Sequence, residues 1–482
     1  MSRKNSLFSL LFIILFNVMT YGQDVKVSRE IGIRNEFVYE IMPDLKGNTL
    51  VYRDRGNQFY FDIFSSNLDF QRTAEINFEQ RRVNVLQVAP FDTTIHIYFN
   101  YYQQDTFYFS RLIYSAEASF IRQDTLVKID RSAVKEKFRF AISQDQTKIA
   151  LFSIGENLTT AVFDVGAGVL LYQNILKLTG IGERENFRNF TVTDDGNVFV
   201  LFEVDNDSGE KNHHFNLLKS IDNQTYSLHR IPMPNKYSSG VKFAYDNKNR
   251  RLGIAGLYSN KYESETNGYY MLNTKVSELQ TDEGFVFVEY DDDLVREMYG
   301  KKKGKNNEIR DQVIKKLVWR ADGGLILITE MEKEYVRRSA LSTIPTLGSP
   351  SLGSQNYSNR GLVDYYHEDM MIFSVFPDGT EHWRKILFKK QFSQDDDGAF
   401  SSFFLFATPS RLHIVYNDEI KNSNTISEYV IDPLGRFERN AVLNTDYQGL
   451  KLRFQDAVQT GSNSFVVPSE KNYKLSLVKV TF

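Results

Sequence analysis

Short stretches in which apolar and polar residues alternate recur along the chain, separated by turn residues. One is KKLVWRADGGLILITEM (Lys315–Met331), where two strand-like runs flank Ala321–Gly324. Glycine readily adopts the positive φ that a tight turn requires, so Asp-Gly and Gly-Gly are typical of hairpins. The alternation has the period of a half-buried strand. The segment therefore predicts a β-hairpin.

The same pattern occurs eight times, and apart from two expanded units the turns are about 50 residues apart. The eight predicted hairpins are Lys315–Met331, Phe190–Val204, Phe140–Ile154, Ile41–Asp54, Phe243–Leu257, Leu86–Asn100, Phe404–Asp418 and Phe454–Pro468. A second hairpin follows each of them, as at Phe59–Phe78, Thr160–Leu176, Met371–Leu387 and Ser427–Leu443. Four antiparallel strands per repeat are typical of a propeller blade. We therefore predict an all-β fold, a β-propeller of eight blades; seven is the main alternative, because three of the copies are weak.

The two ends of the chain supply a further prediction. After its first hairpin, the last repeat has only one more strand, YKLSLVKVTF, before Phe482. An unassigned strand, DVKVSREIGI (Asp24–Ile33), stands near the start. If this strand completes the last blade, the ring closes and its open edge disappears. Residues 23–482 are then one propeller domain.

Two insertions interrupt the repeats. Residues Val288–Gln312 predict a short helix near Asp293–Tyr299, followed by a lysine-rich loop. Residues Tyr335–Met370 have the Ser, Gly and Pro content of a long excursion. Because insertions in repeat proteins often carry binding, both are candidate interaction surfaces.

Residues 1–22 have the form of a signal peptide: two cations, then an apolar run, then TYGQ. The run is short for a membrane span, so we expect cleavage after Gly22, with an uncleaved anchor as the alternative. Removing Arg3 and Lys4 and no acids changes the net charge from -3 to -5. That mild acidity does not favour nucleic acid as a partner. The chain has no cysteine, which excludes disulfides and thiolate metal sites.

Two motifs contain residue types that can bind a metal ion. His213-His214 lies in a segment that we interpret as a solvated loop rather than a metal site. SQDDDG (Ser393–Gly398) has the alternating oxygens of a calcium loop, but the twelfth position is Phe404, which cannot coordinate calcium. We interpret it as a solvated loop between blades.

Two further motifs have similarly plain interpretations. FPDGTEHW (Phe376–Trp383) resembles a blade of quinone-cofactor propellers, yet it occurs once with tryptophan; we expect a turn and a packed indole, with His382 also packing. KKKGK (Lys301–Lys305) is a candidate contact with anionic headgroups, or a solvated loop. The sequence therefore nominates no catalytic residue, no cofactor-binding residue and no metal ligand.

Three segments carry a resemblance to other proteins: Gly253–Lys275, Trp319–Tyr335 and Asp378–Phe406, with Tyr416–Asp418 after the last. They resemble a group of uncharacterised exported propeller-like proteins of the Bacteroidota, as does TYGQ. The resemblance implies a propeller in the periplasm or at the outer membrane, and it transfers no activity.

The leading functional hypothesis is a non-enzymatic scaffold that binds a protein partner at the periplasmic side of the outer membrane, for example as a subunit of an envelope assembly or secretion complex. It combines a complete ring, two long insertions and the lack of a recognisable catalytic motif. The alternative is a glycan-active propeller with an acid pair in its channel, or one that binds glycan without cleaving it. Acids clustered at one channel mouth would favour that alternative, whereas a mixed channel would count against it.

Overall fold

The computed structural model describes most of the chain from Asp24 to Phe482. Residues outside the description are 1–23, 35–37, 57, 132–137, 156, 178–185, 207–211, 224, 262–264, 280–283, 301–306, 338–361, 421–424, 444–446 and 448. The predicted signal peptide and the Lys301–Lys305 run therefore lie outside the described residues, so these two hypotheses remain predictions.

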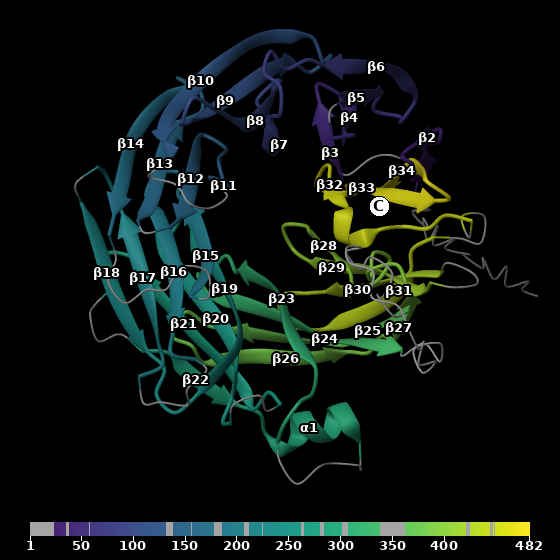
Figure 1. Cartoon of the computed structure of the whole chain (residues 1–482). Helices are drawn as coiled ribbons and strands as arrows, with labels where there is room; N and C mark the ends of the chain where they lie inside the picture. The colour runs from purple at the N-terminus through teal and green to yellow at the C-terminus, as the bar shows by residue number, and fades with distance from the viewer. Residues whose placement is uncertain are drawn as a thin grey trace, which may run out of the picture.

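Eight antiparallel sheets stand around a central axis and form an eight-bladed β-propeller (Figure 1). Blades 1 and 2 are β3 (Val38–Leu45), β4 (Asn48–Asp54), β5 (Phe59–Phe64), β6 (Phe70–Ile76), β7 (Asn84–Phe91), β8 (Thr94–Gln103), β9 (Thr106–Ser115) and β10 (Phe120–Asp130). Blades 3 and 4 are β11 (Arg139–Ile142), β12 (Lys148–Ile154), β13 (Leu158–Asp164), β14 (Val169–Leu176), β15 (Phe187–Val192), β16 (Val198–Val204), β17 (His214–Ser220) and β18 (Tyr226–Pro232). In each blade the first strand is innermost.

The second half of the ring follows the same plan. Blades 5 and 6 are β19 (Tyr237–Asp246), β20 (Arg251–Ser259), β21 (Gly268–Lys275), β22 (Val286–Glu289), β23 (Gln312–Trp319), β24 (Leu325–Arg337), β25 (Leu362–Val375) and β26 (Glu381–Leu387), with β27 (Gln391–Gln394) added to β25. Blades 7 and 8 are β28 (Phe404–Ala407), β29 (Leu412–Glu419), β30 (Thr425–Ile431), β31 (Phe437–Ala441), β32 (Val458–Gln459), β33 (Ser464–Lys471) and β34 (Lys474–Thr481). All eight predicted hairpins are confirmed, and the count is eight blades rather than seven.

The hairpin between β23 and β24 shows why the turns lie where they do. Gly323 has a φ of 82°, which an L side chain rarely adopts. The Gly324 N–H donates to Asp322 Oδ1 at 3.0 Å, and the Gly323 N–H donates to the Arg320 carbonyl at 3.0 Å. The Asp-Gly-Gly sequence therefore satisfies its own backbone groups while it reverses the chain between β23 and β24.

The chain closes its own ring. In β1 (Asp24–Val27), Val27 pairs with Val478 of β34, and β2 (Ile31–Gly32) pairs with the other end of the same strand. Between them the Ser28 N–H donates to the Leu477 carbonyl at 2.9 Å. The predicted closure by the N-terminal strand is confirmed, and it covers an edge of β34 that would otherwise be open.

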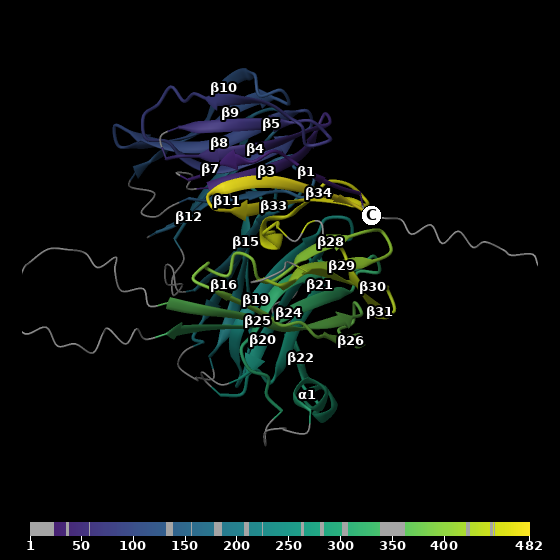
Figure 2. The same cartoon turned by 90° about the vertical axis from the view of Figure 1, so that its right-hand side faces the viewer.

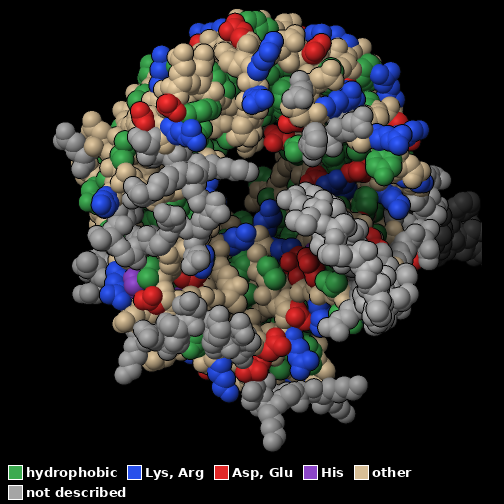
Figure 3. All heavy atoms as spheres, viewed as in Figure 1, with side chains coloured by type: hydrophobic (Ala, Val, Ile, Leu, Met, Phe, Trp, Pro, Cys, Tyr) green, Lys and Arg blue, Asp and Glu red, His purple; other side chains and the backbone are tan. Residues whose placement is uncertain are grey.

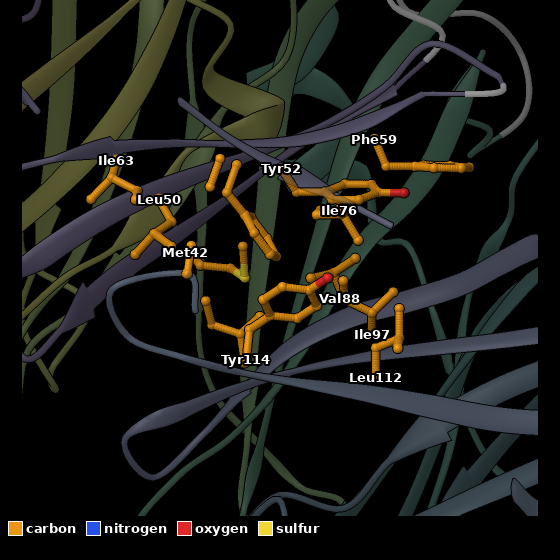
Figure 4. Packing of buried hydrophobic residues seen from close by; sticks show 14 of the residues in the cluster. Met42, Leu50, Tyr52, Phe59, Ile63, Ile76, Val88, Ile97, Leu112 and Tyr114 are labelled. Atoms are coloured by element: carbon orange, nitrogen blue, oxygen red, sulfur yellow. The ribbon is translucent and has the colours of Figure 1, made fainter. Parts of the chain in front are cut away.

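The hydrophobic core is divided among the interfaces between blades. Each of eight buried clusters lies between two neighbouring blades, including one between blades 8 and 1. Figure 4 shows the cluster between blades 1 and 2, where side chains from both sheets interdigitate. Because strand side chains alternate between faces, each sheet contributes to two clusters. Stability is therefore distributed around the ring.

The first insertion contains the predicted helix, α1 (Asp292–Tyr299). Asp291 caps it by accepting a hydrogen bond from the Leu294 N–H at 2.8 Å, and Gly300 ends it. The helix lies at the outer edge of the ring (Figure 1), and its Leu294 and Val295 pack in the cluster between blades 5 and 6. None of the described helices is both long and apolar enough to cross a membrane.

The second insertion differs from the predicted excursion. Its flanks continue the strands of blade 6, because β24 runs on to Arg337 and β25 begins at Leu362. The result is a two-stranded extension that we call the arm, residues 332–337 and 362–367. Figure 2 shows the ends of both strands reaching past one face of the ring. Only residues 338–361 of this insertion lie outside the described part.

Candidate functional site at the root of the arm

The arm leaves one strand edge without a partner. The innermost strand β23 accompanies β24 as far as Met331, which pairs with Gln312. The Glu332 N–H then donates to the Asp311 carbonyl at 2.7 Å. Beyond this bond, residues 333–337 pair with β25 on one side and with no described strand on the other. Tyr335 is 58% exposed, so the free edge carries a large accessible side chain.

The outer side of the arm is held by β27 and the SQDDDG segment. Asp395 Oδ1 accepts the Val363 N–H at 2.7 Å, and the Tyr365 hydroxyl donates to Asp397 Oδ1 at 3.1 Å. Gln394 Nε2 donates to Asp364 at 2.7 Å. Asp395 and Asp397 are exposed, in line with the interpretation as a solvated loop between blades, and the same two acids also accept hydrogen bonds from the arm. The sequence alone did not predict that these acids would contact the arm.

A hollow of about 420 Å³ lies beside the arm where it leaves the ring. Its lining residues are Asp311, Met331, Glu332, Lys333, Tyr335, Tyr366 and Glu368. Two tyrosine rings and a methionine supply apolar surface, while the acids and Lys333 supply charge. Lys333 Nζ lies 3.7 Å from Asp311, so part of that charge is already paired. The hollow and the open edge together form one continuous surface.

Behind this surface is a buried charge cluster of five residues: Lys315, Glu330, Glu332, His367 and Lys389. Lys389 Nζ lies 2.5 Å from Glu330 Oε1, and both side chains are 0% exposed. Lys315 Nζ lies 3.2 Å from Glu330 Oε2 and also contacts Glu332. His367 Nδ1 is 2.9 Å from Glu332 Oε1. Charges buried to this degree must be paired, and here each one is.

The charge cluster also connects blade 6 to blade 7. Ser402, which precedes β28, donates from Oγ to Glu330 Oε2 at 2.6 Å. Lys389 Nζ donates to Gln391 Oε1 at 2.7 Å, and Gln391 Nε2 donates to the Asn417 carbonyl of β29 at 2.7 Å. The root of the arm is thereby fixed to two blades.

Electrostatics keep the carboxylates of this cluster ionised. Burial would raise the pKa of Glu330, but the ammonium of Lys389, a hydrogen bond from His367 and the charge of Lys315 outweigh it and lower that pKa. Burial lowers the pKa of His367, and its bonds to Glu330 and Glu332 reverse that effect and raise it. Burial also lowers the pKa of Lys389, with Glu330 offsetting part of the decrease. In each case the opposite charges of the cluster offset part or all of the effect of burial on the pKa.

Three members of the charge cluster carry side chains of the kinds that bind metal ions. One ligand atom each from Glu330, Glu332 and His367 lies within 4.8 Å of the others. Two ammonium groups already balance the two carboxylates, so a divalent cation would have to displace Lys389 or Lys315. The arrangement therefore fits a network of ion pairs rather than a metal centre.

Sequence reasoning missed this cluster because its members run from residue 315 to residue 389 with no fixed spacing. One signal was present: in LILITEMEKE, Glu330 follows an apolar run that predicts a buried strand. An acid at a position of that kind requires a partner.

The other candidates from the sequence lie elsewhere. His213 is buried rather than solvated, because its Nε2 faces Glu203 Oε1 at 3.0 Å and its Nδ1 faces the Lys236 carbonyl at 2.7 Å. His382 is on β26 and accepts from Arg320 at 2.8 Å. Trp383 packs between blades and donates to the Pro433 carbonyl at 3.0 Å, as the packed-indole interpretation predicted.

No protein-family model matches the chain, and no curated protein matches it. Solved structures are similar in fold. The WD40 domain of SCAP from fission yeast matches 94% of this chain and 98% of its own, with 6% identity and a TM-score of 0.38. Polysaccharide lyase Uly1 matches 95% and 99%, with 8% identity and a TM-score of 0.42. Dihydro-heme d1 dehydrogenase NirN matches 93% and 75%, with 10% identity and a TM-score of 0.43. At these identities the likeness concerns the propeller fold alone.

Proposed function

We propose that this protein is a non-enzymatic interaction subunit that binds a partner protein through the arm of blade 6. The observation that carries the proposal is the open edge of residues 333–337, with Tyr335 and Val336 58% and 59% exposed beside the hollow. Exposed strand edges are ready-made sites for pairing with another chain. The charge cluster supports this role because it holds the arm in one orientation before a partner arrives.

The cellular setting of this proposal comes from the sequence. The form of residues 1–22 supports export, and the resemblance to exported proteins of the Bacteroidota supports the periplasm or the periplasmic side of the outer membrane. In that compartment a rigid ring with a projecting arm suits a scaffold subunit of an envelope assembly or secretion complex.

The alternative, a glycan-active or glycan-binding propeller, receives less support. It needs carboxylates gathered at the channel. On the inner strands β11, β15, β19 and β23, the charged residues are Arg139, Arg188, Lys242, Asp246, Lys315 and Lys316. Five of these six are cations, so this half of the channel wall offers no acid pair.

The test is affinity purification of the tagged full chain from detergent-solubilised envelopes of its host. We expect a stoichiometric partner that is lost from the Tyr335→Ser/Val336→Ser variant. The matched control is Tyr226→Ser/Leu228→Ser on β18, which changes two side chains of 50% and 43% exposure on an outermost strand. Equal melting temperatures would show that both variants are folded. A partner recovered equally with both variants, or no partner at all, would overturn the proposal.

A further inference from the structure

Two lysines of the central channel occupy matching positions on neighbouring blades. Lys242 of β19 is paired with Ala255, and Lys316 of β23 is paired with Ile328. Ala255 and Ile328 each pack in the core shared with the following blade. Directly opposed strand residues share a face, so the two lysines project on the same side of their blades and at the same level. By the same criterion Asn189 of β15 and Arg139 of β11 hold this position in blades 4 and 3.

Among the described cations of the inner strands, these two lysines differ from the others in having neither a counter-ion nor an aromatic partner. Lys315 is paired with Glu330 at 3.2 Å, Arg188 pairs with Glu203, and the guanidinium of Arg139 lies 4.1 Å from the centre of the Phe187 ring. Within the described residues, neither Lys242 nor Lys316 makes an ion pair or a side-chain hydrogen bond. Both are exposed, so a ligand can reach them.

Without a bound anion, the positive charges of Lys242 and Lys316 are unfavourable for one another in their surroundings. The inner strands β19 and β23 pack directly against one another. The protein around Lys316 displaces water and lowers its pKa, and the charges of Lys242 and Lys315 lower it further. Figure 3 shows Lys and Arg side chains on the wall of the central hollow, with Asp and Glu side chains on one part of the same wall. Like charges held together in a partly desolvated place attract an oppositely charged ligand.

We propose that the central channel binds a multivalent oxyanion, which Lys242 and Lys316 contact together. A lysine ammonium is a compact point charge, so it binds anionic oxygens through charge and without the planar geometry that an arginine guanidinium imposes. The site therefore selects ligands with two or more anionic oxygens, such as a polycarboxylate or a phosphate compound. Asn189, at the matching position of blade 4, adds an amide donor at the same level. This proposal does not rest on a partner protein bound at the arm.

The experiment is isothermal titration calorimetry of the full mature chain at low ionic strength, with inorganic phosphate, pyrophosphate and citrate as probes. Binding of pyrophosphate but not citrate would assign phosphate chemistry, and the reverse would assign carboxylates. We expect the Lys242→Gln/Lys316→Gln variant to bind the preferred probe about tenfold more weakly or worse, because each lost ammonium removes a charge-assisted bond. The Lys242→Arg/Lys316→Arg variant keeps the charge and should retain most of the affinity.

The matched control is Lys128→Gln/Lys385→Gln, which makes the same change in net charge on the outermost strands β10 and β26. It should bind as the wild type does. Because Lys242 and Lys316 are exposed, the double glutamine variant should fold, and its melting temperature checks this. Failure of all three probes to bind, or equal binding by the channel variant and the control, would overturn the proposal.

Discussion

The interface between blades 1 and 2 and the interface between blades 6 and 7 solve the same packing problem by different means. Between blades 1 and 2 the contact is apolar and aromatic: Phe61 is fully buried, with its ring centre 5.6 Å from that of Tyr114 and 6.1 Å from that of Tyr52 (Figure 4). Between blades 6 and 7 an apolar cluster is joined by the charge cluster around Glu330 and Lys389.

The difference lies in what each interface determines. Apolar burial is non-directional and tolerates small rearrangements. A buried ion pair is costly to desolvate and is accepted only when each charge meets its partner in good geometry. The contact between blades 1 and 2 therefore stabilises the ring, whereas the charge cluster between blades 6 and 7 also fixes the orientation of the arm. The polar contact coincides with the projecting surface, where orientation matters for binding.

The largest expected effect comes from breaking the charge cluster on one side. In Glu330→Gln, the buried Lys389 and its neighbours Lys315 and His367 lose their shared counter-ion. We expect the free energy of unfolding to fall by about 4 kcal/mol, measured by urea denaturation. The control is Glu438→Gln on the exposed strand β31, with an expected change within about 0.5 kcal/mol. A Glu330→Gln variant as stable as its control would show that the cluster is not buried in solution.

Next in size is a cavity in the apolar interface. Phe61→Ala removes a fully buried ring and should lower the free energy of unfolding by about 3 kcal/mol. Tyr226→Ala, which truncates a half-exposed ring on β18, is the comparison and should stay within about 0.5 kcal/mol. Similar losses in the two variants would mean that the blade 1–2 contact opens easily.

A smaller net effect is expected when both charges are removed. In Glu330→Met/Lys389→Met the buried charges are replaced by apolar groups, so we expect the double variant to be at least about 2 kcal/mol more stable than Glu330→Gln. Its arm should be less ordered, which amide hydrogen exchange of β24 would detect. If exchange in the arm were unchanged, the charge cluster would have no role in orientation, and the contrast between the interfaces would disappear.

The smallest effect concerns pH. The raised pKa of His367 means that its protonation stabilises the fold fully below about pH 6.5, its unfolded value, and that this contribution is lost as pH rises through the folded pKa. The lowered pKa values of Glu330 and Glu332 act in the opposite range: their contribution is present above about pH 4.3 and is lost in acid. Melting temperatures from pH 5 to 9 should decline less at the alkaline end for His367→Gln than for the wild type. Identical profiles would contradict a protonated His367.

The fold could be predicted because its determinants are local and repeated. Turn residues such as Gly323 and Gly196, flanked by alternating apolar residues, mark the hairpins, and the leftover strand at Asp24 predicted how the ring closes. The hydrogen bonds between SQDDDG and the arm were not predicted, and the burial of His213 was predicted wrongly, for the opposite reason. Val363, the partner of Asp395, lies 32 residues away in the sequence, and Glu203, the partner of His213, lies 10 residues away. No periodicity in the sequence relates either pair.

By itself, the sequence determined the fold class, the number of blades, the closing strand and the helix at Asp292, because hydrophobic periodicity and turn chemistry act over a few residues. Only the tertiary structure decided that Lys315, Glu330, Glu332, His367 and Lys389 meet in one cluster. It also placed Lys242 beside Lys316 and left one edge of the arm open. These features depend on how separate blades are set against one another, and the energy of a buried or crowded charge is known only when its neighbours are in place.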